Sequence, residues 1–252
     1  MKERRTTRLA VLMMALALIT SCLAVGTLSK YTVGGNGADN ARVAKWGVVL
    51  DVEASDAFDA SYTGTGNEIT VNADNGDNLV APGTTKGEIK FSITGKPEVA
   101  TKVTVSLGAT KDVFLKYDSD NDGTKDATYY PVVFTLKHTY ATGANPIAPA
   151  VEGTGATVTT NGNTETVTGT LEEINKVLAN LQTAMTQVAP NYVYNDTFVL
   201  SWAWDFEAGN DNLDTILGDI AANVYANGYA KNDGNYCLDT SYSFTIRVDQ
   251  VD

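Results

Sequence analysis

The most concentrated set of metal-binding side chains in the sequence lies in residues 118–126, Asp-Ser-Asp-Asn-Asp-Gly-Thr-Lys-Asp. Carboxylates stand at alternate positions, and a glycine follows where the loop needs a tight turn. Calcium takes six or more oxygen ligands, and this spacing lets one short loop surround such an ion. We therefore predict a calcium site formed by the residues Asp118, Asp120, Asp122, Thr124 (through its carbonyl) and Asp126.

This loop is not an EF-hand, because Tyr129 stands at the twelfth position, where an EF-hand has Glu, and because its flanks read as strands. It looks like the D-x-D-x-D-G-x-x-D calcium loops that cap β-hairpins in extracellular proteins. The alternative is a solvated acidic turn without metal. Crowding of like charges favours a counter-ion.

Enzyme signatures are scarce. The single histidine, His138, ends a predicted strand, where a packing or surface role is the expected one. The sequence contains neither H-E-x-x-H nor G-x-S-x-G. Cys237 has no histidine near it in sequence, so we expect a buried thiol. Trp202, Trp204 and Phe206 share one strand face, which we expect to line the core; a sugar-binding platform is the alternative.

The elements that would position these residues are mostly strands. Apolar and polar residues alternate with period two in many short segments separated by Gly, Asn, Asp and Thr. The fold class predicted is all-β, an antiparallel jelly-roll-like β-sandwich. The predicted strands are 46–52, 88–94, 102–107, 113–117, 129–138, 197–206 and 241–248, with a hairpin over 157–168 that turns at Asn161-Gly162.

Two helices interrupt the strands. Residues 170–188 carry apolar side chains at helical spacing, and Thr170 with Glu173 matches a capping box. Residues 211–225 form a weaker helical pattern, broken by Gly218. We expect both helices to pack an apolar side on the sandwich.

The N-terminus reads as an export signal. Four basic residues precede the uncharged apolar run Leu9–Val25, which has 17 residues. Small residues close the run, so we predict cleavage between Ser29 and Lys30; an uncleaved membrane anchor is the alternative. Ile19-Thr20-Ser21-Cys22 also fits a lipobox, in which Cys22 would be lipidated and would tether the protein to the membrane.

Charge limits the partners of the mature chain. Removing residues 1–29 takes away four basic residues and one acidic residue, which changes the formal net charge from −12 to −15. Such a charge repels nucleic acid and anionic lipid. Only Cys237 remains after cleavage, so the mature chain can form no internal disulfide.

Both ends of the chain resemble a known family. Residues 26–32 and 39–47 resemble the SipW-type signal peptide and mature start of the TasA and camelysin family, which are surface and biofilm-matrix proteins of Gram-positive bacteria. Residues 202–207, 212–218 and 248–252 are similar to uncharacterised relatives that carry this signal. The middle of the chain, about 55–190, has no such resemblance.

The resemblance implies a jelly-roll sandwich, cleavage by a SipW-like signal peptidase and assembly into surface fibres. It also implies that a segment at the mature N-terminus adds as a strand to the next subunit. The matching segment is Lys30, Tyr31, Thr32 and Val33, with Gly34–Gly37 as a hinge. Camelysin relatives have been called metallopeptidases, but this sequence has no zinc-ligand cluster.

We therefore expect a signal peptide at 1–29, a flexible segment at 30–43 and one β-sandwich domain at 44–252. The expected function is a secreted, self-associating structural protein of the cell surface or biofilm matrix, not an enzyme, with calcium as the expected cofactor. Other matrix proteins could be partners. The alternative is a lipid-tethered or soluble extracellular binding module for glycan or protein.

Overall fold

A computed structural model describes residues 43–54, 57–64, 66–67, 69–74, 76–140, 154–184 and 188–251. The chain divides into two compact units, 1–45 and 46–252, and every element named below belongs to the second. The signal peptide, Cys22, the cleavage site at Ser29 and Lys30, and the segment Lys30–Val33 lie outside the described residues.

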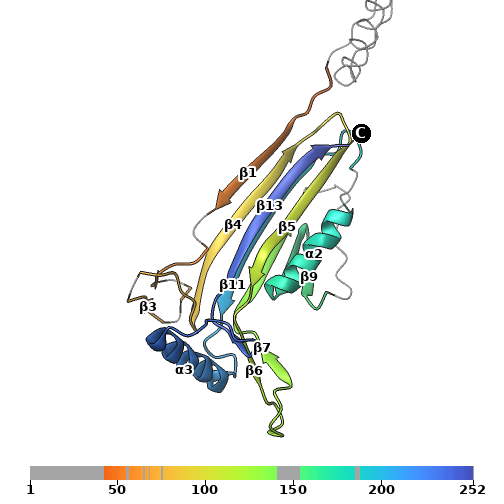
Figure 1. Ribbon diagram of the computed structural model, residues 1–252. Coiled ribbons are helices and arrows are strands. Elements are labelled where there is room, and N and C mark those ends of the chain that lie inside the picture. The colour runs from red at the N-terminus through yellow and green to blue at the C-terminus, as the bar shows by residue number, and fades with distance from the viewer. Residues whose placement is uncertain are drawn as a thin grey trace, which may run out of the picture. The chain divides into compact units, whose positions relative to one another are not determined.

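One layer of the fold is a six-stranded antiparallel sheet (Figure 1). Strict alternation builds it: along the central strand β11, every second side chain from Tyr194 to Trp204 is buried. In spatial order the strands are β1 (Val48–Ala54), β4 (Thr84–Gly95), β11 (Tyr194–Trp204), β8 (Val133–Thr139), β10 (Thr164–Gly169) and β9 (Thr157–Asn161).

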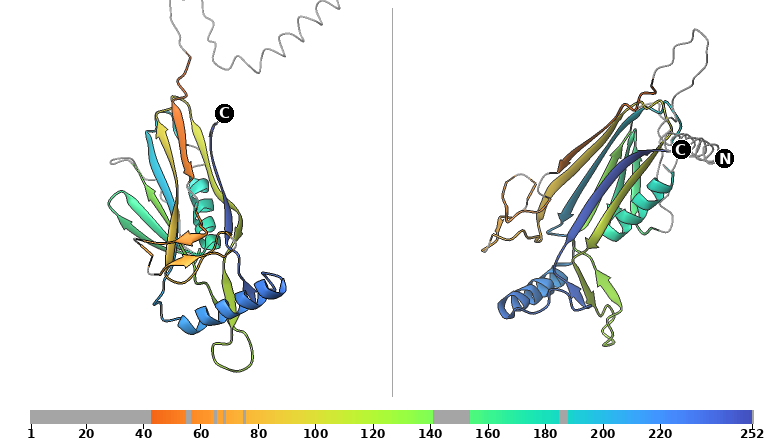
Figure 2. Two further views of the ribbon diagram at one scale, coloured as in Figure 1. Left: turned by 90° about the vertical axis from the view of Figure 1, so that its left-hand side faces the viewer. Right: turned by 45° about the horizontal axis from the view of Figure 1, so that its top comes forward.

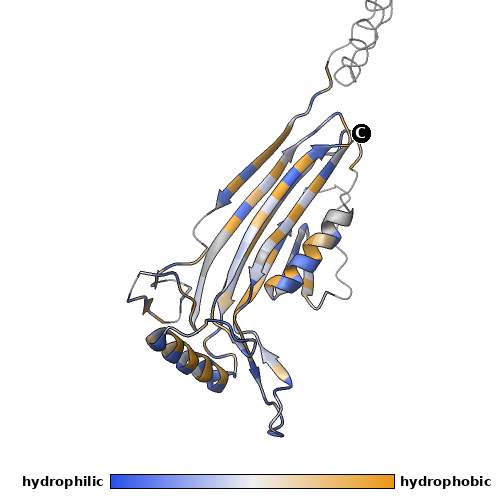
Figure 3. Cartoon of the chain, in the orientation of Figure 1, coloured by the Kyte–Doolittle hydropathy of each residue, from blue (hydrophilic) through white to orange (hydrophobic). Residues whose placement is uncertain are grey.

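The second layer is narrower and combines a two-stranded ribbon with a helix. Strands β5 (Thr101–Lys111) and β13 (Ser241–Gln250) pair in antiparallel register, and helix α2 (Leu171–Ala184) packs beside β5. The alternating apolar residues of β5 and β13 appear as orange bands in Figure 3. The antiparallel, strand-rich fold with two packed helices is confirmed.

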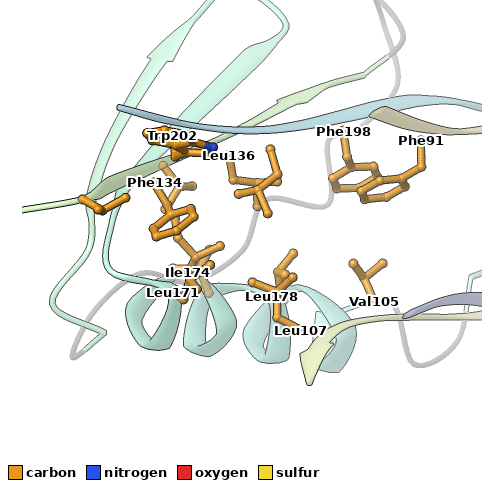
Figure 4. Packing of buried hydrophobic residues seen from close by; sticks show 14 of the residues in the cluster. Phe91, Val105, Leu107, Phe134, Leu136, Leu171, Ile174, Leu178, Phe198 and Trp202 are labelled. Carbon is orange, nitrogen blue, oxygen red and sulfur yellow. The ribbon is translucent and has the colours of Figure 1, made fainter. Parts of the chain in front are cut away.

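The hydrophobic core lies between these two layers. Figure 4 shows Leu171, Ile174 and Leu178 of α2 pointing toward the side chains of the sheet. Phe91 and Phe198 of the sheet stack with ring centroids 4.5 Å apart. All five of these side chains are almost fully buried, so the helix and the ribbon both cover parts of the sheet.

Short elements complete one end of the sandwich (Figure 1). They are the three-stranded sheet β12–β6–β7 with β6 (Phe114–Tyr117), β7 (Ala127–Tyr129) and β12 (Tyr236–Cys237), helix α3 (Asp211–Asn227), and the pair β2 (Ser61–Tyr62) and β3 (Val71–Asn72).

Local signals in the sequence correspond to observed contacts. The Thr170 N–H donates to the Glu173 carboxylate at 2.8 Å, and the Glu173 N–H donates to the Thr170 hydroxyl oxygen at 3.2 Å, so the capping box is confirmed. The hairpin turns through Gly162, whose φ is 59°. Helix α3 runs through Gly218 without a break, contrary to the prediction.

Candidate functional sites

Strand β1 is an edge of the first layer that the ribbon does not cover. Phe244 of β13 lies against Phe91 of β4, with ring centroids 4.2 Å apart, which places β13 over β4 rather than over β1. Neighbouring strands lie about 4.8 Å apart in any sheet. The second layer therefore has no described strand opposite β1. Figure 2 (left) shows β1 in one layer and β13 in the other, on the side of the sandwich that faces the viewer.

The inner face of β1 is apolar but half exposed. Leu50 pairs with Ile93 and Val52 pairs with Phe91, so both side chains point to the core side of the sheet. Ile93 and Phe91 are buried, yet Leu50 is 40% exposed and Val52 is 52% exposed. A covering strand would bury these side chains as deeply as their neighbours on β4.

The edge of β13 faces the same gap in the second layer. Among the described residues, β13 pairs only with β5, so its other edge presents backbone N–H and C=O groups to a further strand. Its core-facing side chains Phe244, Ile246 and Val248 are only partly buried. We call the inner face of β1 together with the outer edge of β13, the edge opposite β5, the seam.

The acidic loop 118–126 connects β6 to β7, so its flanks are strands as predicted. Carboxylate oxygens of Asp118, Asp120 and Asp122 lie within 4.8 Å of one another. Asp118 accepts the N–H groups of Asp120, Asp122 and Gly123, the last at 2.7 Å. The Gly123 N–H is the main cause that holds the pKa of Asp118 below its ordinary value.

The remaining predicted ligands, Asp126 and Thr124, make hydrogen bonds within the same loop. The Asp126 carboxylate accepts both the N–H and the hydroxyl of Ser119 at 2.9 Å, and these bonds lower its pKa. The Thr124 N–H donates to Asp122 at 2.7 Å. The loop thus offers three clustered carboxylates, while the Asp126 carboxylate is bonded to Ser119.

A second polar cluster lies inside the core. Nε2 of His138 is 2.9 Å from Oδ1 of Asp196, and Nδ1 is 3.8 Å from Oε2 of Glu165. All three side chains are buried. Burial alone would lower the pKa of His138, but the carboxylates of Asp196 and Glu165 raise it above its ordinary value.

The geometry of the cluster does not suit a metal ion. The two carboxylates approach opposite nitrogens of the ring, so their oxygens do not converge on one point that a metal could occupy. Each ring nitrogen already faces a carboxylate. His138 is buried in the core, which agrees with the predicted packing role.

Asp196 and Glu165 were not singled out from the sequence. For Asp196 the sequence does contain a signal. It is one of the alternate residues of the run Tyr194–Trp204, and the others at these positions are aromatic or Leu. A charged residue at such a position must find a partner inside the core.

The aromatic face of β11 lines the core, and the sugar-platform alternative is wrong. Trp202 and Trp204 are only 2% and 7% exposed. The Trp202 Nε1–H donates to the Ala57 carbonyl at 2.6 Å, and the Trp204 Nε1–H donates to Asp214 of α3 at 3.1 Å. Both rings and both donors are thus engaged within the fold and are not available to a glycan. Phe206 follows the end of β11 and is partly exposed.

Asp214 joins α3 to the sandwich. Its Oδ1 also accepts the Tyr129 hydroxyl at 2.8 Å. Desolvation is the main cause that raises the pKa of Asp214, while the bonds from Tyr129 and Trp204 act in the opposite direction. Cys237, in the neighbouring strand β12, is a buried free thiol, as predicted.

Comparison with protein-family models, with curated proteins and with solved structures found no match. In the part of the chain that the structure describes, no helix has the length and apolar character to cross a membrane.

Proposed function

We propose that this chain is a secreted structural subunit that associates with further copies of itself at the cell surface or in an extracellular matrix. The observation that supports the proposal is the seam, where Leu50 and Val52 point inward and stay 40% and 52% exposed beside the outer edge of β13, which pairs with no other strand among the described residues. An edge of this kind accepts an extended segment through main-chain hydrogen bonds.

The proposed occupant is the segment Lys30–Val33 of a second copy. Its apolar residues Tyr31 and Val33 alternate with the polar Lys30 and Thr32. A strand with this pattern turns one apolar face to Leu50 and Val52 and one polar face to solvent. The glycine-rich residues that follow allow the segment to leave its own subunit.

The physical driving force is burial of apolar surface together with backbone pairing. Completing the burial of two half-exposed aliphatic side chains contributes on the order of 1 kcal/mol each. Each backbone hydrogen bond adds a net contribution of about 1 kcal/mol. The basic n-region and apolar run at residues 2–25 support export, and the resemblance of both chain ends to TasA-like proteins supports a role in a matrix.

Charged substitutions in the seam test the proposal. We expect the variants Leu50→Lys and Val52→Lys to reduce association at least about tenfold, because the incoming strand would have to bury an unpaired ammonium group. The control is Val49→Lys, on the opposite face of the same strand, where the side chain is 59% exposed. Sedimentation velocity and negative-stain electron microscopy measure association, and melting temperatures confirm that the variants fold.

Two results would contradict the proposal. One is a chain that begins at Lys30 and stays monomeric at all concentrations. The other is equal association of the Val49 and Leu50 variants, which would place the interface elsewhere. If the unmodified chain instead binds a foreign extended peptide at the seam, the binding-module alternative gains support.

A further inference from the structure

His138 belongs to a row of directly paired residues that crosses the sheet. Phe91, Phe198, His138 and Glu165 stand opposite one another on β4, β11, β8 and β10. The His138 ring stacks on Phe198 with centroids 4.2 Å apart and an interplanar angle of 2°. The ring is therefore fixed in its plane, with each nitrogen directed to a different neighbouring strand.

Among the described residues, the titratable side chains near this ring or its Asp196 partner are two acids and three phenols. Asp196 contributes a carboxylate from β11, and Glu165 contributes one from β10. Tyr140 lies 5.6 Å from the imidazole, and Tyr192 and Tyr194 face Asp196. Helix α2 packs against β8 with apolar side chains. The charge that surrounds the ring is therefore negative.

The cluster lacks a hydrogen bond between His138 and Glu165. Within the described part of the chain, neither Nδ1 of His138 nor Oε2 of Glu165 has a hydrogen-bond partner, although both atoms are buried. They lie 3.8 Å apart. An imidazolium carries a proton on both nitrogens and so satisfies both carboxylates, whereas a neutral ring can serve only one of them as a donor.

We propose that His138 is a pH-sensitive lock between three strands: as an imidazolium it joins Asp196 of β11 to Glu165 of β10, and loss of its proton loosens the β8–β10 end of the sheet. Deprotonation leaves two buried carboxylates around a neutral ring, which is the costly arrangement for buried charge. The stacked Phe198 ring favours the cation as well.

The direction of the pH dependence follows from linkage. The pKa of His138 is raised above 6.5 in the folded protein by its two carboxylate partners, despite burial. Its contribution to stability is therefore fully present below pH 6.5, and it is lost as the pH rises through the folded pKa.

Nuclear magnetic resonance can test the lock directly, because the chain contains one histidine and thus one imidazole signal. We expect that signal to titrate above pH 6.5, with both ring nitrogens protonated at pH 6. Urea unfolding of the unmodified chain should show stability that falls between pH 6 and pH 8.5. Amide exchange, corrected for its intrinsic pH dependence, should accelerate in β8 and β10 over the same interval.

Variants separate the lock from a purely structural role. His138→Gln should lose the pH dependence of stability between pH 6 and 8.5, while the control Asp51→Asn, at an exposed carboxylate on β1, should keep it. If His138→Gln does not fold, Glu165→Gln serves instead, and it should lower the imidazole pKa. An imidazole pKa at or below 6.5 in the unmodified chain, or an unchanged pKa in the Glu165 variant, would overturn the proposal.

Discussion

At the scale of single residues, three carboxylates behave in different ways according to burial. Asp118 lies at the surface and accepts backbone N–H groups of its own loop. Asp214 is half-buried and accepts a tyrosine hydroxyl and an indole N–H, which attaches α3 to the sandwich. Asp196 is buried and faces the one histidine. Of the three, Asp118 is the one that a cation from the medium can reach.

Calcium binding at this loop stays a prediction, and thermal unfolding tests it. An ion that binds only the folded chain stabilises it by about 2.7 kcal/mol at a hundredfold excess over Kd. We therefore expect calcium to raise the melting temperature and a chelator to reverse the rise. Asp120→Ala, which removes a ligand oxygen, should abolish the effect, and Asp219→Ala, at an exposed residue of α3, should retain it. A melting temperature that responds to neither calcium nor chelator would exclude the site.

At the scale of elements, backbone shape matters as much as side-chain pattern. Gly95 stands where β4 pairs with both β1 and β11, and its φ is 125°. A Cβ added there would overlap the carbonyl oxygen of Gly47. Gly218 is the opposite case, because it lies within α3 with open space around it.

A matched pair of glycine substitutions tests this contrast. Gly95→Ala should destabilise the fold by about 1–3 kcal/mol, because the backbone conformation and the contact with Gly47 both oppose a side chain. Gly218→Ala should stabilise it by about 0.5–1 kcal/mol, because alanine favours the helix. Urea unfolding at one pH measures both, and effects of the same sign would contradict the assigned backbone geometry.

The sequence predicted elements far better than their packing. Alternation located the strands, and Thr170 with Glu173 located the start of α2, because these signals are local. The pairing of Glu165 with His138 was out of reach, because it joins strands through a register that no local pattern defines. The seam could not be predicted for the same reason, because the half-exposure of Leu50 depends on the position of β13 in the other layer.

At the scale of the whole molecule, the two layers differ in width, and this mismatch is the basis of the proposed assembly. Two layers of equal width would bury the whole inner face of each sheet, whereas here the described ribbon stops over β4 and leaves the inner face of β1 half exposed. The net charge of −12 opposes nonspecific aggregation. Association through one defined strand is consistent with both features.

Photo-cross-linking from the seam tests the proposed assembly most directly. A photoreactive amino acid at Leu50 is placed in the chain that begins at Lys30, and the assemblies are prepared from a mixture of normal and ¹⁵N-labelled chains. We predict cross-linked peptides that join position 50 of one isotopic form to residues 30–33 of the other. Assemblies whose cross-links from position 50 never reach residues 30–33 of a different chain would contradict strand exchange at the seam.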